Sequence, residues 1–195
     1  MSSKDKNRKR LFLIDGPAIY YRAYFAFIRN PLINSHGENT SATFGFTNST
    51  LKILRDEKPD YIAVIFDTKE PTFRHKRYSK YKANRDAMPE DLVEQLPRID
   101  SVIDALNIPS YKLVGYEADD IMGSFTKKAE ALGIDVFLVT GDKDMCQLVS
   151  DHVKIYNPGR GGTNPETMDE EGGIKRWGAR PNQIIDFLAL TGDSS

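Results

Sequence analysis

Cysteine, Cys/His clusters of the kind that bind zinc and long apolar runs are scarce or absent in this chain of 195 residues. The single cysteine, Cys146, excludes an internal disulfide, which fits a reducing intracellular compartment. The three histidines, His36, His75 and His152, are scattered, which excludes a zinc finger. No apolar run is long enough for a membrane span, and segment 1–10 lacks the apolar stretch of a signal peptide. We therefore expect a cytoplasmic protein whose residues 1–10 form a flexible basic arm.

The composition is that of a soluble globular protein, with 39% apolar and 28% charged residues. The length suits one sizeable domain. A net charge of -1 argues superficially against nucleic acid, but the positive charges are unevenly distributed. Segment 69–85 opposes seven cations with the single acid Glu70, and the arm adds Lys4, Lys6, Arg8, Lys9 and Arg10. Such a basic segment beside an acidic pocket can hold a polyanion.

Acidic residues follow three short apolar runs that are typical of buried parallel strands. Runs 11–14 and 61–66 lead directly into Asp15 and Asp67, and run 136–139 leads through Thr140 and Gly141 into Asp142. Ligands of open α/β sheets bind beyond the carboxyl ends of their strands, so these acids are expected to converge there.

Strands alternate with helices along the rest of the chain. Further strands are predicted at 111–114 and 152–156, and helices at 17–27, 42–54, 89–106, 117–132, 144–149, 171–177 and 181–190. This alternation indicates a doubly wound, mainly parallel α/β sheet flanked by helices. The Gly-rich loop 158–163 lacks the Lys-Ser/Thr of a phosphate-binding loop and is expected to be a hairpin or surface loop.

Seven acids in all are predicted to face one site: Asp15, Asp67, Glu117, Asp119, Asp120, Asp142 and Asp144. Oxygen ligands in such number favour Mg²⁺ or Mn²⁺ over zinc. Taken singly, the acids at 117–120 fit a helix N-terminus and those at 142–144 fit a turn. When these acids are considered together with those at two strand ends, a metal-dependent phosphoryl-transfer site explains the whole set better than separate helix and turn roles do.

Segment 69–88 shows no apolar period and reads as a basic, partly helical excursion. A solvated basic loop is the plainer alternative, but the interleaved Phe73, Tyr78 and Tyr81 favour nucleic acid. Its predicted backbone contacts are Arg74, Lys76, Arg77 and Lys80. On the first helix, Arg22 is expected to contact a phosphate. Tyr24 either stacks on a base or belongs to the core.

Several stretches, in order, resemble the 5′-3′ exonuclease domain of bacterial DNA polymerase I, a member of the flap endonuclease family. They are Leu13-Ile-Asp-Gly16, Val64-Ile-Phe-Asp67, Tyr81-Lys-Ala-Asn-Arg85, Gly115-Tyr-Glu-Ala-Asp-Asp120, Thr140-Gly-Asp-Lys-Asp144 and Asp186-Phe-Leu-Ala-Leu-Thr-Gly-Asp193. Any one of these motifs is weak, whereas the ordered set from residue 11 to the end is very specific.

The resemblance implies a PIN-like, resolvase-like fold over 11–195 with a basic helical arch at about 69–88. It also implies a two-metal nuclease that acts on DNA with 5′ flaps or 5′ ends. Asp15, Asp67, Glu117, Asp119 and Asp120 would surround the first ion, and Asp142, Asp144 and Asp193 would reach toward the second. Lys82 and Arg85 would hold the scissile phosphate, sharing one face if the arch is helical, and Tyr81 would stack on a nucleobase.

Family members carry a further acid soon after the position of Asp193 and then a duplex-binding helix–hairpin–helix-like segment. The sequence is therefore expected to be a fragment of a monomeric, nucleoid-associated polymerase I, with a polymerase domain in cis in its parent. A DNA-binding fragment with impaired catalysis is the alternative. A small ribonuclease of the related acidic-site fold is disfavoured by the basic excursion, and a haloacid-dehalogenase-type phosphatase by Pro17, where a second acid would be needed.

Overall fold

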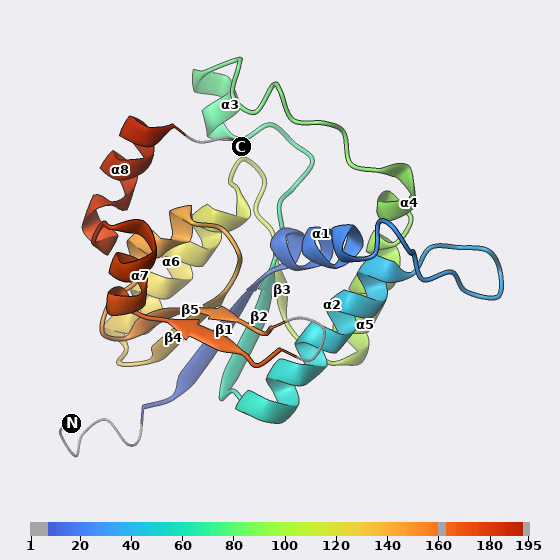
Figure 1. Cartoon of the computed structure of the whole chain (residues 1–195), viewed down its shortest axis with the longest axis horizontal. Helices are drawn as coiled ribbons and strands as arrows, with labels where there is room; N and C mark the ends of the chain where they lie inside the picture. Colours follow the sequence, from blue (N-terminus) through green and yellow to red (C-terminus); the bar gives the residue numbers. More distant parts are fainter. Residues whose placement is uncertain (1–7, 160–162, 193–195) are drawn as a thin grey trace.

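The structure, a computed structural model, describes residues 8–159 and 163–192. Within these ranges the strands form one mixed sheet in the order β3-β2-β1-β4-β5-β6 (Figure 1). The strands are β1 Arg10–Asp15, β2 Tyr61–Ile65, β3 Ser110–Tyr111, β4 Asp135–Val139, β5 Val153–Asn157 and β6 Glu166–Met168. Neighbouring strands are parallel except β5 and β6, which pair antiparallel. The expected mainly parallel α/β sheet is confirmed.

Helices cover both faces of the sheet because the side chains of its central strand alternate between two apolar cores. Phe12 and Ile14 face α1 Gly16–Ala26, α2 Ser41–Lys52 and α5 Leu96–Ala105, whereas Leu13 faces α6 Ala118–Ala131 and α8 Ile184–Thr191. The remaining elements are the π-helical turn Ile53–Glu57, α3 Phe73–Arg77, α4 Glu90–Val93, the 3₁₀ turns Asp144–Leu148 and Pro181–Gln183, and α7 Glu170–Trp177. No helix among the described residues is long and apolar enough to cross a membrane.

Three boundaries differ from the sequence prediction. The strand expected at 111–114 is reduced to the two residues of β3, and β6 was not expected. The single helix expected at 89–106 divides into α4 and α5. Pro97 has no N–H for the carbonyl of Val93, and the side chain of buried Gln95 instead accepts hydrogen bonds from the Ala42 and Thr43 amides, at 2.9 and 3.2 Å. The break in one helix therefore supplies the cap of another.

The described part of the N-terminal arm is fixed rather than flexible. Arg10 opens β1, and Arg8 forms an ion pair of 2.7 Å with Asp135 of β4. Arg10 also pairs with Glu57. These cations lie at the amino end of the sheet, opposite the edge to which the acids belong, so the prediction of a free basic arm is wrong for residues 8–10. Lys4 and Lys6 lie outside the described residues.

Helices α1 and α2 approach closely where Gly45 meets Ala23. A Cβ at Gly45 would lie 2.5 Å from the Ala23 Cβ, whereas a Cβ at Gly123 of α6 would be 3.9 Å from Leu148. We expect Gly45→Ala to lower the free energy of unfolding by about 1–3 kcal/mol through overpacking. Gly123→Ala should instead raise it by about 0.5–1 kcal/mol through helix propensity.

Urea unfolding of both variants measures these changes. Adding Ala23→Gly should recover part of the loss caused by Gly45→Ala. Equal effects of the two glycine substitutions would contradict the close approach of α1 and α2.

Candidate metal centre and nucleic-acid interface

Acidic residues from three strand ends meet at the carboxyl edge of the sheet. Asp15 ends β1 and also begins α1, since its carboxylate accepts the Ala18 amide at 3.0 Å. Its other oxygen accepts the Thr140 hydroxyl at 2.7 Å. Asp67 lies two residues beyond β2 and accepts the Ala118 amide at 2.7 Å. The predicted convergence of β1, β2 and β4 on one point is thus present.

Two carboxylates in this place, Asp15 and Asp119, lie close enough to Asp67 and Asp142 to feel their negative charges. Burial, together with the negative charges of Asp15, Asp142 and Asp67, raises the pKa of Asp119 to about 7, against the opposing charge of Lys82. Burial likewise raises the pKa of Asp15, which is only 5% exposed, although hydrogen bonds from Ala18 and Thr140 oppose the shift. The cluster is electrostatically strained without a cation.

The N-terminus of α6 carries three of the predicted acids. Glu117 is its N-cap, and the Asp120 carboxylate accepts the Glu117 amide at 3.0 Å in a capping box. Asp119 instead interacts with the acids from the strand ends. The helix-capping role considered from the sequence is therefore present for Glu117 and Asp120, and a metal-binding role of the three acids stays a prediction.

Cations of the basic excursion form ion pairs with the two capping acids. Arg74 makes two hydrogen bonds to Asp120, at 2.7 and 2.8 Å, and its guanidinium lies 3.5 Å from Glu117. Lys82 pairs with Glu117 at 2.9 Å, and the Tyr81 hydroxyl donates to the same carboxylate at 3.0 Å. The Arg74 bonds lower the pKa of Asp120. Arg74 was expected to contact the nucleic-acid backbone, and the structure pairs it with Asp120 within the acidic site.

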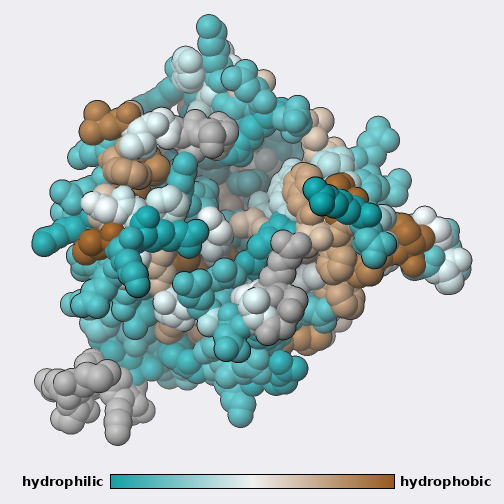
Figure 2. Space-filling model, viewed as in Figure 1, coloured by the Kyte–Doolittle hydropathy of each residue, from teal (hydrophilic) through white to brown (hydrophobic). Residues whose placement is uncertain are grey.

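The excursion crosses the molecule between α3 and α4, and the surface is hollowed below α3 (Figures 1 and 2). Only Phe73–Arg77 is helical, and 79–84 is a series of turns in which Lys82 has a φ of 54°. The expectation that Lys82 and Arg85 share a helical face is therefore wrong. Lys82 turns toward Glu117, and Arg85 is exposed. Lys76, Arg77 and Lys80 are exposed as expected for surface cations.

Tyr24 is a core residue, so the prediction that it contacts nucleic acid is wrong. Its side chain is 6% exposed, and its hydroxyl donates to Asp91 at 2.7 Å. Asp91 also accepts from Asn39 at 2.8 Å. The ring cannot stack on a base because it is packed in the apolar core that contains Phe12 and Ile14 and is covered by α4 and α5.

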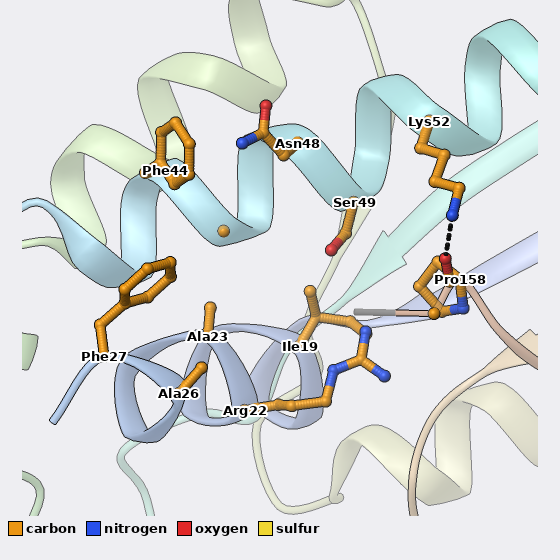
Figure 3. A pocket seen from close by; sticks show the side chains of 12 residues that line it. Ile19, Arg22, Ala23, Ala26, Phe27, Phe44, Asn48, Ser49, Lys52 and Pro158 are labelled. Atoms are coloured by element: carbon orange, nitrogen blue, oxygen red, sulfur yellow. Dashed lines mark hydrogen bonds between the residues drawn. The ribbon is translucent and has the colours of Figure 1, made fainter. Parts of the chain in front are cut away.

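Arg22 lines a cavity of about 470 Å³ between α1 and α2 (Figure 3). Its guanidinium donates to Asn157, at the end of β5, at 2.8 Å. On the other side of the cavity, Lys52 donates to the carbonyl of Pro158 at 2.8 Å. These bonds join α1 and α2 to the loop after β5. A phosphate contact by Arg22 stays a prediction.

The acids predicted for a second ion are described only in part. The Asp144 amide donates to the Asp142 carboxylate at 2.8 Å, which is the turn-forming role considered from the sequence. Asp193 lies outside the described residues. Cys146 is buried, as expected.

Two residues near the acids were not predicted for the site. The Thr140 hydroxyl donates to Asp15 and accepts from the Asp142 amide at 3.1 Å, so it joins the ends of β1 and β4. Burial is the main cause of the raised pKa of Tyr21 in α1. The charge of Arg85 lowers this pKa and that of Asp67 raises it. Thr140 was visible in a quoted motif, whereas the orientation of Tyr21 depends on how α1 packs.

The described carboxylates are the ligand type that a hard divalent ion prefers, but in this conformation they are not arranged to hold one. Among residues 8–159 and 163–192, no three Asp, Glu, His or Cys side chains are arranged to hold an ion in this conformation. The reason is visible in the contacts, because Glu117 and Asp120 are turned toward Lys82 and Arg74. Oxygen-only donors of one charge, partly buried, match the preference of Mg²⁺ or Mn²⁺.

Comparison with known proteins identifies a family. A model described as the 5′-3′ exonuclease, N-terminal resolvase-like domain matches residues 10–178. DNA polymerase I of Chloroflexus aurantiacus is 44% identical over 188 residues, covering 95% of this chain and 20% of that protein. DNA polymerase I of Bacillus subtilis is 42% identical over 189 residues, covering 96% of this chain and 21% of that protein. The chain thus spans about a fifth of these relatives.

Solved structures share the fold at low sequence identity. The T5 D15 protein, co-crystallised with metal ions, superposes with a TM-score of 0.74 at 19% identity, over 95% of this chain and 67% of that one. The catalytic core of Rad2 in complex with a DNA substrate gives 0.55 at 19% identity, over 96% and 55%. The resolvase-like, PIN-like fold expected from the sequence is confirmed.

The burial of Asp119 and the repulsion from its neighbouring acids make the metal-free protein sensitive to pH. The pKa of Asp119 is about 7 in the folded chain and near 3.8 when unfolded, so folding favours its protonated form. This contribution is present below pH 4 and is lost as the pH rises toward 7. In EDTA, we expect Asp119→Asn to raise the Tm at pH 7.5 by about 2–4 °C or more and to flatten its fall between pH 5 and 7.5.

Thermal unfolding across this pH range measures both effects, with exposed Asp104→Asn as the control substitution. Parallel pH profiles for the Asp119→Asn and parent proteins would show that Asp119 is not under repulsion.

Proposed function

Because the chain belongs to the family of 5′-3′ exonuclease N-terminal resolvase-like domains, we propose that it is a divalent-metal-dependent 5′ nuclease that hydrolyses DNA phosphodiesters at flaps and 5′ ends. The observation that carries the proposal is the cluster of Asp15, Asp67, Asp119 and Asp142 beside Lys82 of the basic excursion, with Asp15 buried and Asp119 and Asp142 half-buried. A negative site covered by cations can bind a polyanion only if further positive charge enters it.

The residues that would hold metal ions are the clustered carboxylates. Asp15, Asp67 and Asp119 would contribute to the first site, with Glu117 and Asp120 once their arch partners move away, and Asp142, Asp144 and Asp193 would serve the second. Two Mg²⁺ or Mn²⁺ ions supply an activated water and charge neutralisation for in-line phosphoryl displacement. Since Asp15 is fixed by Ala18 and Thr140 and Asp67 by Ala118, these two side chains need the least rearrangement.

The cations of the excursion would bind the substrate. Lys82 and Arg74 now neutralise Glu117 and Asp120, so their ammonium and guanidinium groups already lie beside the place where a phosphate would meet the acids. Lys82, released from Glu117, and the exposed Arg85 would hold the scissile phosphate and offset its growing negative charge. Exposed Lys76, Arg77 and Lys80 would follow the DNA backbone without reading its sequence. Tyr81, freed from Glu117, would present its ring to a base.

The relatives also suggest a setting for this activity. Since they are named DNA polymerase I and are about five times longer, we infer that residues 11–195 act as the nuclease domain of such a polymerase, with segment 69–88 as its arch. Replication and repair of DNA in the cytoplasm, by a monomer associated with the nucleoid, would follow.

A DNA-binding module without efficient cleavage is the second candidate. It is favoured by one observation, that among the described residues the acids are not arranged to hold an ion. The two candidates differ in what they expect after metal is added. For the nuclease, added metal displaces Lys82 and Arg74 from the acids and cleavage follows. For the binding module, DNA stays intact.

Cleavage of a 5′-flap DNA labelled at its 5′ end tests the proposal. The parent protein should release short labelled products with Mg²⁺ and none with EDTA. Asp142→Asn and Asp119→Asn should each slow single-turnover cleavage at least about a hundredfold, because loss of a metal ligand removes several kcal/mol of transition-state stabilisation. Asp104→Asn should cleave like the parent.

Intact DNA in both conditions, with a folded parent protein that binds the flap, would favour the binding module. Cleavage at the parent rate by both site variants would show that these carboxylates do not hold the catalytic metal.

A further inference from the structure

A second cavity lies on the outer side of α6, next to the acidic site. It measures about 490 Å³, and its apolar wall consists of Phe73 from α3, Leu113 and Tyr116 from the loop before α6, and Phe125 of α6 itself. The capping acid Asp120 lies at one end. This volume is within the range of small-molecule pockets.

Phe73, Tyr116 and Leu113 of this cavity are open to solvent, whereas Phe125 packs against the core. Phe73 is 37% exposed, Tyr116 47% and Leu113 53%. The rings of Phe73 and Tyr116 are 5.8 Å apart and tilted by 55°, and the Arg74 guanidinium lies 4.6 Å from the centre of the Phe73 ring. Exposed rings grouped in a concave surface indicate a binding site more than a fold requirement.

The two ends of the cavity are polar. Asp120, Ser124 and Lys128 follow one another at intervals of four along α6, so they form one stripe beside the rings. At the near end, Asp120 is neutralised by Arg74. At the far end, the side-chain ammonium of Lys128 makes no hydrogen bond or ion pair with any residue in the described ranges. Its charge is therefore available to a ligand.

We propose that this cavity binds a nucleobase of single-stranded DNA, with the adjoining phosphate at Lys128. Stacking on Phe73 and Tyr116 suits any base, because every base has a flat aromatic face. A purely apolar peptide fits less well, since it would bury the Lys128 ammonium without a partner. The inference rests on the proposed nuclease function and adds to it a base-binding position outside the metal centre.

The cavity lies next to the proposed metal centre, on the neighbouring side of α6. Asp119 and Asp120 are neighbours in the chain, yet Asp119 interacts with the acids of the metal centre and Asp120 lines the cavity. Arg74 connects the two places, since it binds Asp120 and also lies against the Phe73 ring. A strand whose phosphate is held at the acids can therefore place a base a few nucleotides away among these rings.

The test combines changes in the protein with changes in the DNA. Equilibrium binding is measured with 5′-flap DNA in the Asp142→Asn background, which is expected to leave the DNA uncut. One abasic site is moved through successive positions of the single-stranded arm. Tyr116→Leu should weaken binding about tenfold, and one abasic position should do the same. The two losses should not add when combined, because each removes the same contact.

Two further variants separate the cavity from general surface effects. Lys128→Ala should reduce the slope of log Kd against log salt concentration by about one. Val114→Ala is the matched control, because Val114 is 63% exposed in the same loop but does not line the cavity, and it should bind like its parent.

Each outcome decides the proposal. If the parent cleaves flap DNA but the ring and base losses multiply to about a hundredfold at every position, the cavity does not bind a base and the nuclease function stands. If the parent neither binds nor cleaves flap DNA, both proposals fail. Coupling of Tyr116 to one position of the arm identifies the base that the cavity holds.

Discussion

Mutual repulsion among carboxylates at one edge of the sheet is the constraint on which the rest of the site depends. Parallel strands β1, β2 and β4 deliver Asp15, Asp67 and Asp142 to the same edge, and α6 adds Asp119. Burial and the charges of Asp15, Asp142 and Asp67 together disfavour the charged state of Asp119 and raise its pKa. The chain compensates with backbone amides at Ala18 and Ala118 and with the Thr140 hydroxyl.

Positive charge for the neighbouring acids comes from the basic excursion. Lys82 and Arg74 hold Glu117 and Asp120, and these pairs also fix an otherwise irregular segment against α6. In the proposed enzyme, the same cations would bind a phosphate after metal ions take their place at the acids. One set of contacts would thus stabilise the metal-free protein and keep the substrate-binding groups near their targets.

The sequence predicted the backbone of the site better than its side-chain partners. Apolar runs ending in Asp15 and Asp67 placed both acids at strand ends, because strand length and burial are local properties. The partners of Arg74 and Tyr24 depend instead on tertiary packing. Arg74 is distant from Asp120 in the chain, and the hydroxyl of Tyr24 donates to Asp91, which belongs to another helix, α4. A charge-rich segment without apolar period, such as 69–88, gives no local signal of which acids it will meet. The antiparallel strand β6 was missed for a similar reason, since its three residues are held mainly by β5.

In the proposed enzyme, Glu117 would hold a metal ion at the position that Lys82 occupies in the metal-free protein. Calorimetric titration with Mg²⁺ in the absence of DNA tests it most directly, by comparing the parent with Lys82→Met and with Lys80→Met. Lys80 lies in the same turn but is exposed, so it controls for the loss of one positive charge. The account predicts that Lys82→Met binds Mg²⁺ more tightly than both other proteins. Equal affinities for the two methionine variants, or weaker binding by Lys82→Met, would contradict it.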